Sequence, residues 1–352
     1  MPRETMTPRE RWLAVLTRKE PDRVPMDYWA TPEASENLVR HLGCANLTEV
    51  FDRLHIDAVA HVGPQYIGPP PNDGEDIWGV RHRMIQYDTG VYSEAITHPL
   101  ANYASVEEID ANYRWPSPDW WDFSMIPQQV AAAGERPIRG GGSEPFLQYC
   151  VLRGLEQAMV DLIESPEIVE YGLGKLFDLS YEMTARIYDQ APGQVMVTYI
   201  AEDMGSQESM LFSPAQVKRF LLPGMRRMID LAHEAGAFVF HHSDGAIRPI
   251  LPTMIEAGID VLNPVQWRCK GMDREGLKRD FGHLVIFHGG VDNQYTLARG
   301  AVEEVEREVA DNLRILGEGG GYMLAPCHNI QAVSPPANIV AMYETGYALG
   351  WT

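Results

Sequence analysis

The chain has 352 residues, 45% of them hydrophobic, and carries a formal net charge of −20 from 29 basic and 49 acidic side chains. This length suits one large α/β barrel or two ordinary domains, and the acidity argues against nucleic acid and anionic membranes as partners. Without an apolar run of about 18 residues, a signal-peptide core or closely paired cysteines, the chain predicts a cytoplasmic protein with neither a transmembrane helix nor a disulfide framework.

The first predicted strand carries polar side chains at its end. Residues 23–29 indicate a strand that ends near residue 30. Its Asp27 and Tyr28 either line a pocket or simply end the strand beside core aromatic residues. Around it we expect helices from residue 7, at 31–42 and at 46–54, and a second strand at 57–60.

Residues 63–125 differ in character from the rest of the chain. A Pro- and Gly-rich stretch at 63–74 precedes an alternating pattern at 77–97, which predicts a β-hairpin turning at Asp88-Thr89-Gly90. We interpret this region as an insertion that covers the mouth of a barrel, with Trp78, Tyr87 or Trp120 near the opening. Its aromatic residues either bind an apolar substrate or pack the insertion onto the body.

From residue 136 onward, strand and helix patterns alternate regularly. Strands are predicted at 137–140, 195–200, 237–240, 259–263, 284–290 and just before Cys327-His328. The helices predicted between them are 146–163, 166–190, 214–220, 223–235, 247–257 and 302–316. With the two earlier strands, the count of about eight favours a (β/α)8 barrel, an α/β fold.

Polar side chains follow almost every predicted strand. Because the carboxyl ends of barrel strands meet at one face, we expect these side chains to converge there. The residues are Asp27, Glu202, Asp203, His241, His242, Asp244, Asn263, His288, Cys327 and His328. His241 is expected to be structural, since alternation along a strand points it away from His242.

Several motifs give the chain a family resemblance. They are RVPMDY at 23–28, DIWG at 76–79, EDMG at 202–205, HSDG at 242–245, NPVQ at 263–266, HGGVD at 288–292, GGGY at 319–322 and APCHNIQ at 325–331. With these motifs the chain resembles the uroporphyrinogen decarboxylase superfamily, especially its methyltransferase-like branch. The resemblance implies that residues 1–352 form a single (β/α)8 barrel domain with its site at the carboxyl-terminal face.

The decarboxylases of this superfamily need no metal and hold a tetrapyrrole with arginines near the N-terminus. Their Arg-Gln-Ala-Gly-Arg segment is replaced here by Trp29-Ala30-Thr31-Pro32-Glu33. A substrate with eight carboxylates would then face a protein of charge −20. The resemblance therefore argues against decarboxylation of uroporphyrinogen itself.

The methyltransferases of the superfamily move a methyl group to or from a corrinoid protein, and many bind zinc through His-x-Cys and a later Cys. The resemblance assigns His242 and Cys327 to this site and puts Asp244 where the first Cys would be. Zinc accepts carboxylate oxygen, so a His/Asp/Cys site with one open position is chemically feasible and suits an oxygen-bound methyl donor. Glu202 is a fourth ligand or a neighbour of the ligands. Alternatively, the metal site is lost and Asp244 caps the following helix.

We therefore expect a methyltransferase that moves a methyl group between a small, O-methylated substrate and a corrinoid protein. The chain lacks the Asp-x-His-x-x-Gly pattern of a corrinoid-binding domain, so the cobamide would arrive on a partner. The alternatives are a metal-free decarboxylase of a smaller acid, a hydrolase or lyase, and a non-catalytic binding barrel. The oligomeric state stays open, with a homodimer as one option.

These expectations give each candidate residue a role. The catalytic residues are Glu202, Asp203 and His242, and the zinc ligands are His242, Asp244 and Cys327. The substrate-binding residues are Asp27, Tyr28, Asn263, Gln266, His288 and His328.

Overall fold

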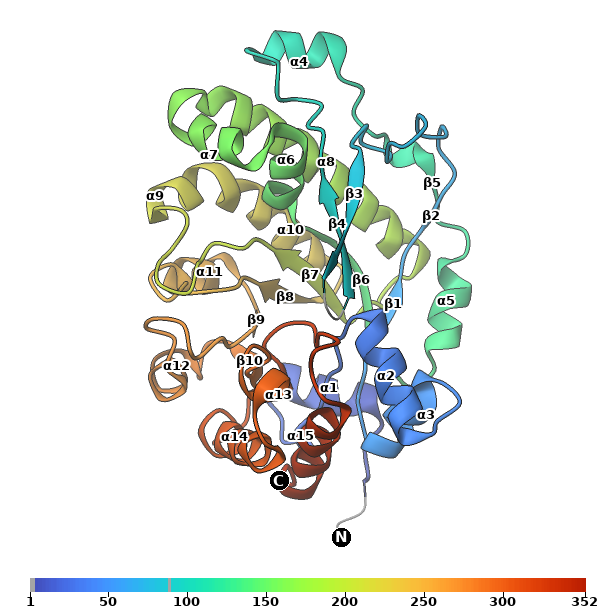
Figure 1. The fold of residues 1–352 in the computed structure, drawn as a ribbon, viewed down its shortest axis with the longest axis vertical. Coiled ribbons are helices and arrows are strands. Elements are labelled where there is room, and N and C mark those ends of the chain that lie inside the picture. The colour runs from blue at the N-terminus through green and yellow to red at the C-terminus, as the bar shows by residue number, and fades with distance from the viewer. Residues whose placement is uncertain (1–3, 88–89) are drawn as a thin grey trace.

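A continuous sheet of seven parallel strands forms the centre of the protein in a computed structural model, which describes residues 4–87 and 90–352 (Figure 1). The strand order is β1-β6-β7-β8-β9-β10-β11, so that each strand from β6 to β10 pairs with the next along the chain. The bounds are Ala60–Val62, Ile138–Ser143, Val197–Ala201, Phe238–His242, Val261–Asn263, Ile286–Val291 and Tyr322–Pro326. All these pairings are parallel, and helices follow the strands, as the barrel prediction requires.

The segment around Met26 closes the sheet into a barrel. Met26 forms a parallel bridge with Leu324 of β11, and the amide of Asp27 donates to the Leu324 carbonyl at 2.9 Å. On its other side, the Met26 carbonyl accepts from the amide of Asp57, just before β1, at 2.7 Å. The predicted first strand thus occupies the eighth strand position of the barrel. Its pairing is short because Pro25 has no N–H to donate. The predicted α/β barrel is confirmed.

Helices surround the sheet, and most lie where the sequence predicts them. The structure gives α1 Pro8–Leu16, α2 Pro32–Leu42, α3 Leu47–Leu54, α5 Ile126–Ala133, α6 Pro145–Arg153, α7 Leu155–Glu164, α8 Pro166–Gln190, α9 Pro214–Gln216, a π-helical turn η2 Val217–Leu221, α10 Leu222–Glu234, α11 Leu251–Ala257, α12 Arg274–Phe281, α13 Thr296–Arg299, α14 Val302–Ile315 and α15 Pro336–Leu349. The helix predicted at 146–163 is two helices, because Gly154 adopts φ 87° between α6 and α7. Among the described helices, none is long and apolar enough to span a membrane.

Helix α1 covers the amino-terminal end of the barrel. Trp12 is fully buried there, and its indole N–H donates to the Asp57 carbonyl at 3.0 Å. It packs with inward-facing strand residues, among them Val197 and Phe240, in a core inside the barrel that is separate from the larger core under the helices. Helix α1 thus closes the amino-terminal end. The polar side chains at the strand carboxyl ends lie at the opposite end of the barrel, which stays accessible.

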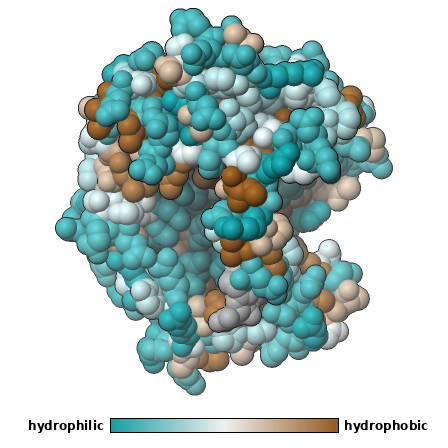
Figure 2. Space-filling model, turned by 45° about the horizontal axis from the view of Figure 1, so that its top comes forward, coloured by the Kyte–Doolittle hydropathy of each residue, from teal (hydrophilic) through white to brown (hydrophobic). Residues whose placement is uncertain are grey.

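The insertion predicted at 63–125 forms small elements of its own. They are β2 Gln65–Tyr66, the hairpin strands β3 His82–Tyr87 and β4 Gly90–Ala95, α4 Val106–Asn112, a 3-10 turn η1 Pro118–Trp120 and β5 Trp121–Asp122. The hairpin is confirmed, although Asp88 and Thr89 of its predicted turn lie outside the described residues. Arg153 of α6 ties the insertion to the body by donating to the Tyr103 carbonyl at 2.7 Å. Figure 2 shows the surface recessed beside this region.

Two of the aromatic residues predicted near the mouth can be located. Trp78 lines a surface recess together with Arg139 of β6 and Tyr199 of β7. Trp120 instead packs edge-on against Tyr66, with its ring centroid 6.4 Å away, and away from this recess. The side chain of Tyr87 lies outside the described residues. The insertion as a cover over the site thus stays a prediction that Trp78 can test.

Candidate functional site

Three potential metal ligands meet at the carboxyl ends of β8 and β11. The ligand atoms of His242, Asp244 and His328 all lie within 4.8 Å of one another, and we call these residues the candidate metal group. The Nε2 atom of His242 lies 3.8 Å from Asp244 Oδ1, and that of His328 lies 4.0 Å from Asp244 Oδ2. Two imidazoles and one carboxylate are a donor set that suits zinc.

A chain of hydrogen bonds orients His242. Because Asp27 Oδ2 can only accept, His288 donates to it from Nε2 at 3.0 Å and accepts at Nδ1 from the Asn263 amide at 2.7 Å. The oxygen of the same amide then accepts the Nδ1 proton of His242 at 2.6 Å. The Nε2 lone pair of His242 is therefore free and faces the group, which is the tautomer that a metal requires.

His328 is held in the same way. Its Nδ1 bonds to the side-chain oxygen of Asn329, which also accepts from Gln331 Nε2 at 2.8 Å. The Nε2 atom of His328 is thereby directed toward Asp244. Both histidines thus present the same nitrogen to the candidate metal group, each fixed by an amide oxygen behind it.

Acidic side chains crowd this site. Burial, together with the charges of Asp203 and Glu144, raises the pKa of Asp244 to about 7. Burial and the charge of Asp203 likewise raise the pKa of Glu144 to about 7. Asp244 Oδ1 is buried and has no hydrogen-bond partner among the described residues. Burial lowers the pKa of His242, which favours its neutral, metal-binding form. A divalent cation would fit this arrangement, because it would neutralise the carboxylates and bind the unpaired oxygen.

The predicted third zinc ligand lies outside the group. Cys327 is not in the candidate metal group: its thiol donates to the Val265 carbonyl at 3.2 Å, and it lines a different cavity with Gln266 and Cys269. The Cys327 amide donates to the Val291 carbonyl at the end of β10, and the chain bends just after β11, so that the Cys327 side chain faces Val265 while that of His328 faces Asp244. His328, predicted to bind substrate, therefore takes the place expected for Cys327. Burial also raises the pKa of the Cys327 thiol well above its usual range.

Glu202 is not in the group either. It is 2% exposed, and its two carboxylate oxygens accept from the amide of Phe146, at the start of α6, at 2.9 and 3.2 Å. Its bonds to Phe146 hold the start of α6, and burial raises its pKa well above the usual value. Asp203 is the carboxylate that faces the site, with Oδ1 3.6 Å from His242 Nε2.

The remaining predicted residues either line the site or bond to the backbone around it. Gln266 accepts from the amide of Gly245 at 2.6 Å and so holds the loop that carries Asp244. His241 is fully buried and bonds the Ile200 carbonyl at 2.7 Å, on the far side of β8 from the site, as alternation predicts. Tyr28 lines the cavity described next, and its hydroxyl bonds Ser35 at 2.9 Å.

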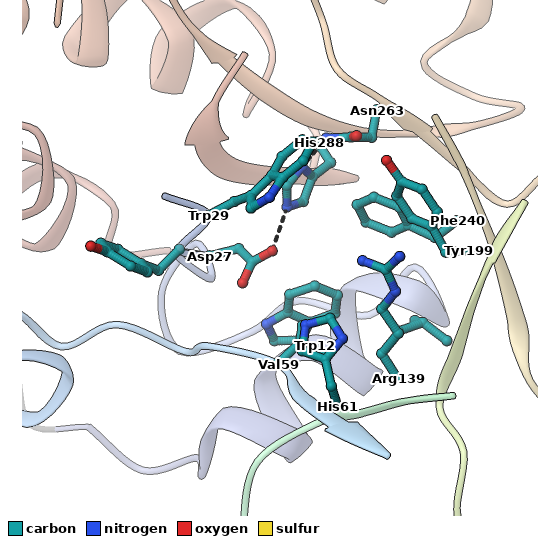
Figure 3. A pocket seen from close by; sticks show the side chains of 12 residues that line it. Trp12, Asp27, Trp29, Val59, His61, Arg139, Tyr199, Phe240, Asn263 and His288 are labelled. Atoms are coloured by element: carbon teal, nitrogen blue, oxygen red, sulfur yellow. Dashed lines mark hydrogen bonds and ion pairs between the residues drawn. The ribbon is translucent and has the colours of Figure 1, made fainter. Parts of the chain in front are cut away.

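A cavity lined mainly by aromatic side chains lies inside the barrel beside the candidate metal group (Figure 3). Its lining residues are Trp12, Asp27, Tyr28, Trp29, Val59, His61, Arg139, Val197, Tyr199, Phe240, Asn263 and His288. Trp29 joins the cavity to the metal group, since its ring centroid is 4.7 Å from that of His328 and 5.6 Å from that of His242.

Several of these cavity residues were not predicted from the sequence. Arg139, Tyr199 and Phe240 lie within strands, whereas the predicted site residues follow the strands. A charged side chain inside a buried strand was the available signal for Arg139. The aromatic residues gave no such signal, because they also suit a core.

The fold is an α/β barrel with polar side chains gathered at the carboxyl ends of its strands. The family model described as "Uroporphyrinogen decarboxylase (URO-D)" matches residues 125–348, and the chain belongs to this family. A uroporphyrinogen decarboxylase from Syntrophotalea carbinolica is 28% identical over 228 residues, which cover 61% of this chain and 61% of that protein. A solved methyltransferase from Methanosarcina mazei shares the fold, with a TM-score of 0.71 and 19% identity over 97% of this chain and 99% of that one.

Proposed function

We propose that this chain is a zinc-dependent methyltransferase that moves a methyl group between a small O-methylated substrate and the corrinoid of a partner protein. The observation that carries the proposal is the convergence of His242, Asp244 and His328 at the barrel mouth. The fold that the chain shares with the Methanosarcina mazei methyltransferase supports it further.

In this proposal, three residues bind the metal ion and one transfers a proton. His242, Asp244 and His328 would hold the ion and leave a position open for substrate oxygen. Zinc, when bound, supplies a Lewis acid that polarises this oxygen. The corrinoid of the partner would supply the nucleophile that accepts the methyl group, and the substrate oxygen would leave with the electron pair of its C–O bond. Asp203 is half-exposed beside His242, where it can pass a proton from solvent to the leaving oxygen.

A tetrapyrrole is a poor candidate substrate for this site. Trp29 covers His328 and His242 in the segment where the uroporphyrinogen decarboxylases carry arginines. Among the described residues that line the cavity, Arg139 is the only arginine or lysine. A single cation does not match a substrate with eight carboxylates. Arg139 does favour a second candidate function, the metal-free decarboxylation of a smaller acid.

Metal analysis of matched variants tests the proposal. We expect the purified protein to bind about one zinc ion. His242→Ala and His328→Ala should lose both zinc and methyl transfer to a corrinoid protein, because each removes one of three ligands. Cys327→Ala is the control and should keep its zinc, since the thiol bonds a carbonyl outside the group.

Full turnover by protein verified to be metal-free would refute the zinc mechanism. Release of CO2 from a small acid by the same sample would then establish the decarboxylase function. Loss of zinc in Cys327→Ala, with zinc retained in His328→Ala, would restore the ligand set predicted from the sequence.

A further inference from the structure

We infer that the cavity inside the barrel binds a small aromatic carboxylate and that Arg139 holds its carboxylate group. The inference deepens the proposed function by naming the substrate class of the same site, and it rests on that proposal in taking the cavity as the substrate site.

Arg139 is a partly buried cation that forms no ion pair with any described residue. Its guanidinium stacks on the Tyr199 ring at 3.7 Å and forms no hydrogen bond or ion pair with any described residue. Asp27, the acidic residue that lines the same cavity, pairs with His288 at 3.0 Å instead. Burial lowers the pKa of Arg139, yet a guanidinium stays protonated in proteins. Figure 3 shows this group pointing into the cavity, where an anion could pair with it.

The walls around this cation are aromatic. Trp12, Trp29, Tyr199 and Phe240 line the space, so that a flat ring would find ring faces and edges to pack against. His61 adds no competing positive charge, because burial and the neighbouring Arg139 lower its pKa. Aromatic walls with a single fixed cation select a planar acid over an aliphatic polyacid.

The cavity also directs such a ligand toward the metal group. Tyr199 stacks on Arg139 and has its ring centroid 5.5 Å from that of His242. A ring whose carboxylate pairs with Arg139 therefore lies alongside Tyr199, and its other end approaches His242. Asp27 Oδ1 is buried without a partner among the described residues and can accept from a hydroxyl on the ring. A methoxybenzoate carries its carboxylate and its methyl ether on one flat ring, so the carboxylate can pair with Arg139 while the ether approaches the metal group.

Binding titrations with benzoate and its methoxy derivatives test the inference. Quenching of fluorescence from Trp12 and Trp29 reports entry into the cavity, and calorimetry gives Kd. We expect wild-type protein to bind a methoxybenzoate and Arg139→Gln to bind it about 30-fold or more weakly, because the carboxylate loses its cation. The neutral methoxybenzamide should bind weakly and equally to both. Arg279→Gln is the control: it makes the same charge change at an exposed site and should match wild type.

Some results of these titrations would overturn the inference and others would support it. Failure of every methoxybenzoate to bind, equal binding of acid and amide, or unchanged binding in Arg139→Gln would overturn the inference. Arg139→Lys should recover part of the affinity, which separates loss of charge from misfolding. Zinc content is measured on the same samples: acid binding through Arg139 in a protein that takes no zinc would keep this inference and refute the zinc proposal. Zinc binding without acid binding would keep the zinc proposal and refute this inference.

Discussion

One amide side chain decides which nitrogen of His242 is available. Asn263 accepts from His242 at 2.6 Å with its oxygen and donates to His288 at 2.7 Å with its nitrogen. The direction is set by Asp27, which can only accept from His288 at the far end. A carboxylate that does not belong to the candidate metal group thus fixes the tautomer of a residue that does.

Asn263→Ala should weaken zinc binding about 10- to 100-fold without removing a ligand, the usual effect of losing a partner of a metal-bound histidine. His242 could then rotate and expose either nitrogen. The measurement is zinc affinity by competition with a chelating dye. Gln207→Ala is the control, since Gln207 is exposed and bonds Gln294 at 3.0 Å. Unchanged affinity in Asn263→Ala would mean that packing alone orients His242.

The sequence predicts some site residues and misses others for reasons visible at single positions. His242 and Asp244 were predicted together because alternate residues of a strand share a side, and they do meet. Just after β11 the chain bends, so that Cys327 and His328 face different sides, and the family pattern favoured Cys327 while His328 lies in the group. Arg139 was missed because its importance depends on the absence of a partner, which is known only once the acids around it are located.

At the scale of elements, a buried carboxylate fastens the closing strand of the barrel. Asp57 accepts from Arg23 Nη1 at 2.7 Å, from Arg11 Nη1 at 2.5 Å and from the Met26 amide at 2.9 Å. Asp57 is 1% exposed and the two arginines are as deeply buried. The contacts join α1 to the segment around Met26 and to the start of β1.

Asp57→Ala should lower the free energy of unfolding by about 3–5 kcal/mol, because two buried guanidinium groups lose the buried anion that they share and keep only Asp22 and Glu4, which lie nearer the surface. Urea denaturation at neutral pH measures the change. Asp119→Ala removes an ion pair of similar length to Arg186, but Asp119 is 77% exposed, and its loss should cost less than about 1 kcal/mol. Equal effects of the two substitutions would show that the buried network does not fasten the barrel.

Element boundaries were predictable where the chain marks them locally. Proline at the first position of α8 and the capping box of α1 set their starts correctly. The break between α6 and α7 was missed, because a single Gly154 inside a helical pattern is also compatible with an unbroken helix. The strand around Met26 depends on partners from β11 and from the residues before β1, which no local pattern reveals.

For the whole molecule, the regular alternation of strands and helices after residue 136 was enough to predict the barrel. The position of the insertion was not predictable in the same way, because it depends on contacts between distant residues. Arg153 of α6 bonds the carbonyls of Leu100 and Tyr103, and Tyr171 of α8 bonds Asp110 at 2.6 Å. These contacts seat the insertion against helices that follow it in the chain.

The insertion should contribute to substrate binding through Trp78. This residue shares a recess with Arg139 and Tyr199, so its loss would open the side of the cavity to water. We expect Trp78→Ala to weaken binding of a methoxybenzoate about tenfold, roughly the contribution of one aromatic contact. Trp120→Ala is the matched control, because Trp120 packs on Tyr66 away from the recess and should affect stability alone. If both variants bind as wild type does, the insertion is a packing element and the barrel alone forms the site.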